Sequence, residues 1–252
     1  MNEHPFNFSI YYGPPRRGET PAVIGAKFLQ SLDALSRIDP LFANWNVLDL
    51  PALASLPLAV ARPRIATIVE NNVVRDDDGE PEPEFGYSAI GVTETAIPSR
   101  IVDFSVKCGG LFRDEMNLRV GDFIYPTDPL IVKYSLFREA LLATSAIWHP
   151  NWASVSAFKG DFWEEPMPLA VTAIPNSTFH IPWIAYVSPA RAVHFPLPAD
   201  IRTERAPDGG LLLTVTEEPF DPTDPEHLRR ARALVETMIT CLGKTGESDN
   251  RD

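Results

Sequence analysis

Cysteine and long apolar runs are both scarce in this chain. Its 252 residues include only two cysteines, Cys108 and Cys241, far apart and without metal-ligand spacing. So few cysteines suit a reducing compartment, and the sequence therefore predicts a cytoplasmic protein. No stretch approaches the roughly 18 uninterrupted apolar residues of a membrane span. The N-terminus shows no basic region followed by an apolar one, so we expect no signal peptide.

Basic residues are too few to balance the acidic ones. The chain has 22 Lys and Arg against 34 Asp and Glu, a formal net charge of −12. A basic face for DNA or RNA is therefore not expected. Two interpretations of the acidity stay open: it keeps the protein soluble, or it forms a surface complementary to a basic partner.

The acidic charge is concentrated in residues 76–84. This segment contains no base and six acids, which equal half the net charge in size: Asp76, Asp77, Asp78, Glu80, Glu82 and Glu84. Its prolines and charges predict an exposed loop. A calcium loop starting at Asp76 is not expected, because Pro81 occupies the sixth position, where the sharp turn needs glycine.

Motifs of common enzyme classes are missing. The chain has no phosphate-binding glycine loop, no nucleophile elbow and no His-Glu-x-x-His helix. No Asp/Glu-x-Lys triplet of a restriction-type nuclease occurs either. One alternative stays open, a hydrolase or metal-dependent enzyme that uses His180, His194 and Asp161.

A second acidic cluster contains a tryptophan. It consists of Asp161, Trp163, Glu164 and Glu165. These carboxylates could form a general acid/base pair or a metal site, but no partner base is close in sequence. The cluster could equally anchor a protein partner, since Trp is favoured at interface centres.

The sequence Pro-Thr-Asp-Pro occurs twice, at residues 126–129 and 222–225, each time between a strand-like run and a helical one. Asp or Thr can cap the free N–H groups of a helix's first turn, and proline at the first position has no N–H to leave unpaired. We therefore interpret Asp128 and Asp224 as helix caps rather than active-site acids.

Apolar spacing predicts an α+β fold, with mostly antiparallel sheet packed with about four helices. The expected strands are 6–11, 86–93, 101–108, 118–125, 153–158, 180–187, 201–205 and 211–216. The expected helices are 21–38, 63–73, 130–144 and 226–242. Trp45 is placed in a loop and residues 51–61 in a turn.

Two runs of strands that each end in a capped helix hint at a pseudo-repeat of βββα units. We expect a single domain over residues 1–252, with sub-halves at 1–146 and 147–242. The polar residues 243–252 are expected to form a disordered tail.

Several patches, taken in order, resemble a known family. They are the strand 6–12 with Gly13 and Arg16, the segment 39–45, Lys107-Cys108-Gly109-Gly110 with Asn117, and a closing segment of residues 209–218, Phe220-Asp221 and 224–228. The closing segment is the most specific of these. Over the whole chain the arrangement resembles the immunity protein 52 family of bacterial polymorphic toxin and type VI secretion systems.

The resemblance implies a non-enzymatic protein without cofactor or metal. Such a protein would bind and neutralise a cognate toxin, often a restriction-endonuclease-like nuclease, and would contact neither nucleic acid nor membrane. The family offers no motif for its toxin-contacting residues, so charge must indicate them. We expect the six acids of 76–84 to contribute most, and the 161–165 cluster less. A scaffolding subunit of the secretion apparatus is a further alternative.

Overall fold

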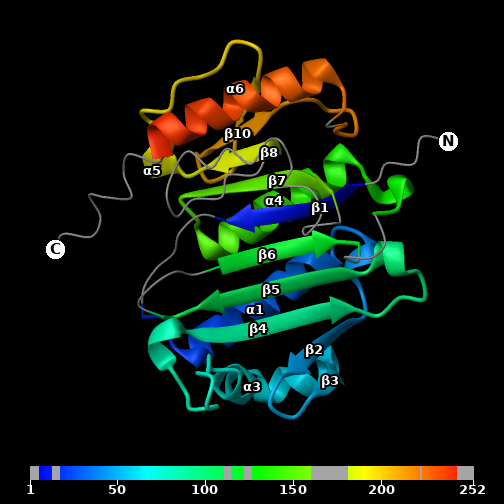
Figure 1. Ribbon diagram of the computed structural model, residues 1–252, viewed down its shortest axis with the longest axis vertical. Coiled ribbons are helices and arrows are strands. Elements are labelled where there is room, and N and C mark those ends of the chain that lie inside the picture. Colours follow the sequence, from blue (N-terminus) through cyan, green and yellow to red (C-terminus); the bar gives the residue numbers. More distant parts are fainter. Residues whose placement is uncertain are drawn as a thin grey trace.

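The computed structural model describes residues 6–12, 18–110, 115–121, 127–159, 181–221 and 223–242. Within these ranges a single ten-stranded sheet forms the fold, in the order β3-β2-β4-β5-β6-β1-β7-β8-β10-β9 (Figure 1). All neighbouring strands in it are antiparallel. The strands are β1 (Phe6–Tyr12), β2 (Trp45–Asp49), β3 (Ala54–Pro57), β4 (Tyr87–Thr93), β5 (Val102–Cys108), β6 (Glu115–Val120), β7 (Trp152–Lys159), β8 (Pro182–Val187), β9 (Arg202–Arg205) and β10 (Leu211–Thr214).

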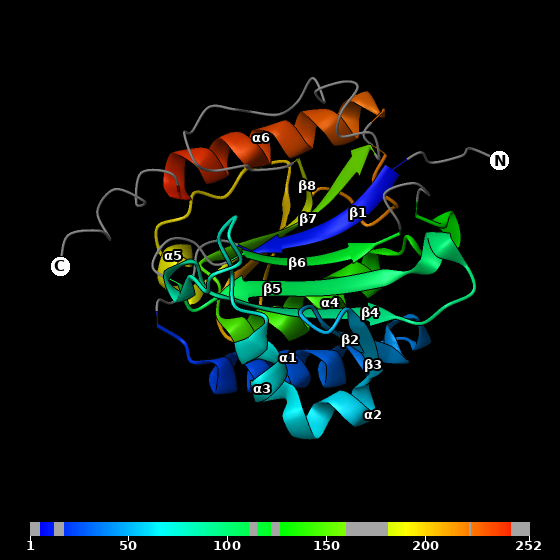
Figure 2. The same ribbon diagram turned by 60° about the horizontal axis from the view of Figure 1, so that its bottom comes forward.

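Helices cover both sides of the sheet. They are α1 (Pro21–Ser36), α2 (Leu58–Ala61), α3 (Ile65–Asn71), α4 (Tyr134–Trp148), α5 (Pro189–Ala192) and α6 (Pro225–Leu242). Figure 2 shows α1, α3 and α4 on one side of the sheet and α6 on the other. Among the helices described, none has the length and apolar character needed to cross a bilayer.

The N-terminal strand β1 lies in the middle of the sheet. It pairs with β6 on one side and with β7 on the other. Phe8 is 1% exposed, and its ring lies 5.4 Å from that of Phe137 on α4 and 5.6 Å from that of Trp183 on β8. The first strand of the chain therefore joins strands that come from both predicted sub-halves.

Helix α1 follows from its sequence pattern. The Thr20 hydroxyl accepts a hydrogen bond from the Val23 N–H at 3.4 Å, and Pro21 occupies the first helical position. The apolar residues Ile24, Phe28, Leu32 and Leu35 recur at helical spacing, and all are fully buried.

A buried hydrogen bond joins α1 to α4. The Trp148 indole N–H donates to the Ser31 hydroxyl at 2.8 Å, and this hydroxyl donates to the Lys27 carbonyl at 2.9 Å. Lys27 Nζ lies 5.2 Å from the centre of the Trp148 ring, a cation–π contact. The two long helices on this side of the sheet are therefore fixed against each other by polar contacts as well as by packing.

The strands differ in how they are covered. β5 alternates buried and half-buried residues, which is the pattern of a strand with one well-covered face. Every residue of β8 and of β10 is buried, so both faces of these two strands are covered. The α6 helix packs against β8 through a stripe that includes Ala231, Leu234, Val235 and Met238.

The predicted fold class is confirmed, since the chain is α+β with antiparallel pairing. The pseudo-repeat of βββα units stays a prediction. With the 3₁₀ turns left aside, β4-β5-β6-α4 is followed by β7-β8-α5-β9-β10-α6, and the spatial order at that end of the sheet is β8-β10-β9. The single domain stays a prediction; the sheet continues without a break through both expected sub-halves.

Several expected element boundaries were wrong. Trp45 begins β2 and is 3% exposed, instead of lying in a loop. Residues 51–61 contain β3 and α2 rather than only a turn. The helix expected at 130–144 is preceded by a 3₁₀ turn (Pro129–Ile131) and runs from Tyr134 to Trp148.

Replacing Phe8 with Ala should lower the free energy of unfolding by about 3–5 kcal/mol, because it empties the centre of the aromatic cluster. Chemical denaturation followed by circular dichroism measures this. Leu130, which is 70% exposed, provides the control: Leu130→Ala should change the free energy by less than about 0.5 kcal/mol. Equal effects of the two substitutions would contradict the central position of β1.

Candidate functional site

The acidic segment 76–84 forms an ordered hairpin, here called the acidic hairpin, between α3 and β4 (Figure 1). The Asp76 N–H donates to the Glu80 carbonyl at 3.0 Å, and the Gly79 N–H donates to the Asp76 carbonyl at 3.1 Å. The Asp76 carboxylate accepts from the N–H groups of Asp78 and Glu80 at 3.0 and 2.8 Å. This side chain therefore shapes the turn that carries the other acids.

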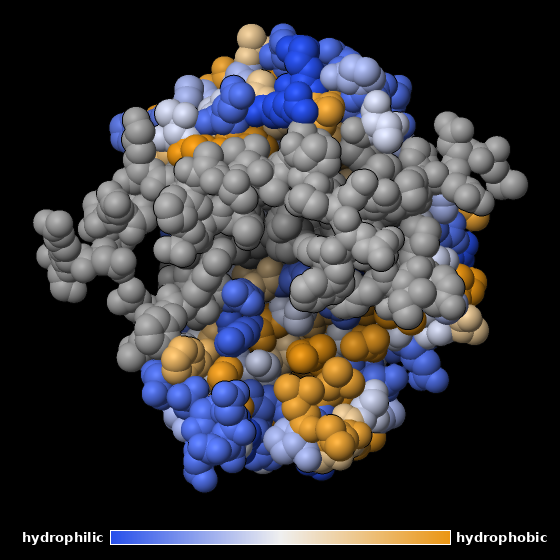
Figure 3. Space-filling model, viewed as in Figure 1, coloured by the Kyte–Doolittle hydropathy of each residue, from blue (hydrophilic) through white to orange (hydrophobic). Residues whose placement is uncertain are grey.

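The acids of the hairpin outnumber the nearby base Arg75, whose guanidinium donates to the Gly79 carbonyl at 2.8 Å. Glu82 is half-buried and the other five acids are exposed. No ion pair found in the described part of the chain includes any of the six. Figure 3 shows hydrophilic residues gathered at the lower left, where the acidic hairpin lies in Figure 1. A basic partner would meet a fixed group of negative charges here.

Glycines hold the base of the acidic hairpin against the end of β5. A Cβ on Gly110 would lie 2.7 Å from the Glu84 carbonyl oxygen and 2.8 Å from the Gly86 nitrogen. Gly86 has φ +93°, and a Cβ there would lie 2.7 Å from the Cys108 carbonyl oxygen. Only glycine fits such an approach without a backbone shift. The Cys108-Gly109-Gly110 patch therefore positions the acids.

The second acidic cluster lies outside the described residues. This holds for Asp161, Trp163, Glu164 and Glu165, and also for His180. Their proposed roles, and the enzyme alternative that depends on Asp161 and His180, stay predictions. His194 is described and is exposed just after α5. Within the described ranges, no group of three or more His, Cys, Asp or Glu side chains is placed to hold a metal.

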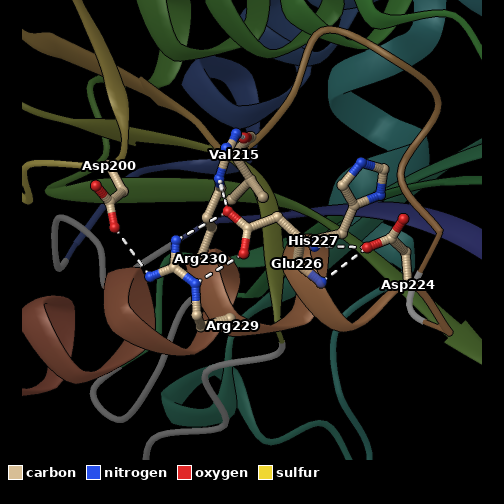
Figure 4. A network of polar contacts seen from close by, with 7 residues as sticks. All are labelled: Asp200, Val215, Asp224, Glu226, His227, Arg229 and Arg230. Carbon is tan, nitrogen blue, oxygen red and sulfur yellow. Dashed lines mark hydrogen bonds and ion pairs between the residues drawn. The ribbon is translucent and has the colours of Figure 1, made fainter.

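Asp224 of the second Pro-Thr-Asp-Pro copy lies at the start of α6 (Figure 4). The Asp224 carboxylate accepts from the backbone N–H of Glu226 at 2.8 Å and of His227 at 3.2 Å. Pro225 occupies the first helical position. The carboxylate thus binds the free N–H groups of the first turn, as a helix cap does.

An ion-pair network surrounds this first turn (Figure 4). The Glu226 carboxylate accepts from the guanidinium groups of Arg229 and Arg230 at 2.8–2.9 Å. These hydrogen bonds lower the pKa of Glu226 to about 2. Arg229 also donates to Asp200 at 2.9 Å, which links α6 to the segment before β9. The charges of this surface are paired with one another, in contrast to those of the acidic hairpin.

Other residues of the closing segment are structural too. The His227 ring stacks on Phe220, with 5.8 Å between the ring centres. Its Nδ1 accepts a hydrogen bond from the Asp221 N–H at 3.2 Å. The segment therefore fixes the turn between β10 and α6.

The first copy caps a shorter element. Asp128 accepts from the Leu130 N–H at 2.9 Å and from the Arg100 guanidinium at 2.7 Å, and both bonds lower the pKa of its carboxyl group. The turn that it caps is the 3₁₀ turn Pro129–Ile131, whereas α4 begins after Lys133 without a side-chain cap.

A hollow of about 430 Å³ lies beside the start of β2. Trp45, Leu58, Arg62 and Glu94 are among the residues that line it. The Trp45 indole N–H is buried and has no hydrogen-bond partner among the residues that the structure describes. Arg62 is paired with Asp33 through two hydrogen bonds of 2.6 and 3.0 Å.

The β2–β3 turn is an exposed apolar feature that the sequence analysis missed. Its four residues, Leu50, Pro51, Ala52 and Leu53, are all exposed and apolar. Leu53 is 94% exposed and has φ +48°. Turns normally use Gly, Asn, Asp or Ser at such positions. The sequence signal for this feature was the apolar run 51–61, which prolines interrupt. Its apolar residues follow neither a helical nor a strand period, so the sequence predicts no buried face for them.

Replacing Asp224 with Ala should lower the free energy of unfolding by about 0.5–2 kcal/mol, because two N–H groups of α6 lose their acceptor. Asp224→Asn is the matched control, since it removes the charge but keeps an oxygen that can cap. Thermal or chemical denaturation of both variants measures the difference. If Asp224→Asn lowers the free energy of unfolding as much as Asp224→Ala does, the negative charge stabilises the helix and the capping hydrogen bonds do not.

One solved structure has a fold similar to that of this chain. It is described as Pseudomonas aeruginosa T6SS protein PA0821, and the match has a TM-score of 0.53 and 13% sequence identity. The match covers 92% of this chain and 72% of that protein. At this identity the likeness concerns the fold alone. No curated protein sequence matches the chain.

The family comparison covers nearly the whole chain. The model of the family described as immunity protein 52 matches residues 8–244. This range includes the acidic hairpin, the glycines at its base and the capped start of α6. The chain therefore belongs to the immunity protein 52 family.

Proposed function

We propose that this immunity protein binds and neutralises a cognate secreted toxin, and that it does so by binding alone, without catalysis of its own. We further propose that the toxin is a restriction-endonuclease-like nuclease and that the complex forms in the cytoplasm. Family membership supports the immunity function. The fold neighbour is described as a T6SS protein, which supports a toxin delivered by such a system.

The acidic hairpin is the observation that carries the proposal. A nuclease cleft must attract a phosphate backbone, so it presents Lys and Arg side chains. A rigid surface of unpaired carboxylates is complementary to such a cleft, increases the association rate and opposes the entry of nucleic acid. The acids of the hairpin are exposed and its backbone is held by hydrogen bonds and by Gly86 and Gly110. The backbone of the hairpin therefore loses little conformational entropy when the toxin binds.

Replacing all six acids of the hairpin with Asn or Gln should slow association with the toxin about tenfold or more, because electrostatic steering is lost. The Asn at position 76 keeps the oxygen that shapes the turn. The measurement is the association rate by surface plasmon resonance at several salt concentrations. The variant should also show a weaker salt dependence than the unmodified protein.

Two double variants give a matched control for net charge. Asp77→Asn with Asp78→Asn removes two charges from the acidic hairpin, and Glu218→Gln with Glu236→Gln removes two exposed charges near α6. Only the first pair should slow association. Equal rates and equal salt slopes for the two pairs would contradict the role of the hairpin, while binding by the unmodified protein would still support the immunity function.

A further inference from the structure

Given the proposed function, we propose that the toxin-binding surface is composite, and that the apolar β2–β3 turn supplies its hydrophobic part beside the acidic hairpin. The partner is the same toxin. It must present an exposed apolar patch adjacent to the basic cleft that meets the acids.

The two features lie at the same edge of the sheet. β3, β2 and β4 are consecutive strands there, the turn joins β2 to β3, and the acidic hairpin leads into β4. Figure 3 shows hydrophobic residues gathered at the bottom of this face, to the right of the hydrophilic corner. A partner that covers one feature therefore comes close to the other.

Asn72 physically connects the turn to the hairpin. It is 3% exposed, its Oδ1 accepts from the Leu50 N–H at 2.9 Å, and its Nδ2 donates to the Leu48 carbonyl at 3.0 Å. Its own carbonyl accepts from the Ser88 N–H at 3.0 Å. Val73, the next residue, forms an antiparallel bridge with Tyr87 at the start of β4. Asn72 thus holds the turn with its side chain and the start of β4, next to the hairpin, with its backbone carbonyl.

Leu53 is unfavourable for the stability of the turn but well placed to contact a partner. Leucine in the left-handed region is sterically unfavourable, and its side chain is 94% exposed. Asn or Gly would fit this conformation better. The β9 edge of the same sheet carries Arg202, Glu204 and Arg205, as edge strands that avoid association do. The β3 edge, beside the turn, has no such charges in Ala54–Pro57.

Charge and apolar area have different roles at such a surface. Exposed acids mainly raise the association rate, and a desolvated apolar contact mainly slows dissociation. The composite surface therefore combines an apolar part with a charged part, as protein interfaces do.

Leu53→Asn tests the proposal without damage to the fold. The melting temperature should stay unchanged or rise, because Asn tolerates the left-handed conformation. The dissociation constant for the purified cognate toxin should rise about tenfold or more, mainly through faster dissociation. Val193→Asn, at another exposed apolar position (73% exposed), is the control and should leave binding unchanged.

The outcomes separate this inference from the proposed function. If the unmodified protein does not bind the toxin, the proposed function fails. If it binds, and Leu53→Asn binds equally well, only the composite surface is overturned. Light scattering of both proteins without toxin tests self-association: a dimer that Leu53→Asn dissociates would assign the turn to a second copy of this chain and would also overturn the inference.

Discussion

The fold depends on β1 lying between β6 and β7. Without this strand the described sheet would consist of two separate groups, β3-β2-β4-β5-β6 and β7-β8-β10-β9. β1 forms hydrogen bonds with both groups. Its residue Phe8 also packs against Phe137 of α4 and Trp183 of β8. Because β1 comes first in the chain and β6 and β7 much later, its pairing requires contacts between distant segments. This pairing joins the two groups into one sheet.

The edge at β3 and β4 shows how a rigid scaffold displays the proposed binding surface. Close backbone contacts at the glycines fix the base of the acidic hairpin, and hydrogen bonds to the Asp76 carboxylate fix its turn. Asn72 holds the neighbouring turn through two hydrogen bonds. The polar groups at the other end of the sheet bind one another, as the Glu226 network does. Unpaired charge and exposed apolar surface therefore lie together at one edge, whereas Glu226, Arg229 and Asp200 at the start of α6 are paired with one another.

Sequence patterns predicted the elements whose formation depends on residues close to one another in the chain. The apolar stripe of α1, the strand β5 and the exposed acidic segment were all recognisable from spacing and composition. β2 and β3 were missed because their pairing depends on Asn72 and β4, which no local period reveals. The shift of α4 has a similar cause: Asp128 is held by Arg100, 28 residues earlier, and caps only a 3₁₀ turn. The exposure of the acidic segment could be predicted, whereas the position of the apolar turn at the edge of the sheet depends on long-range strand pairing.

Hydrogen–deuterium exchange on this protein, alone and with its cognate toxin, tests the central claim most directly. Amide exchange reports which backbone segments a partner covers, at the level of individual peptides. The account predicts that the toxin slows exchange in peptides spanning residues 73–87 and 48–56, and leaves peptides around β9 and the start of α6 unchanged. Protection confined to β9 and α6, with the acidic hairpin and the β2–β3 turn exchanging as in the free protein, would contradict it.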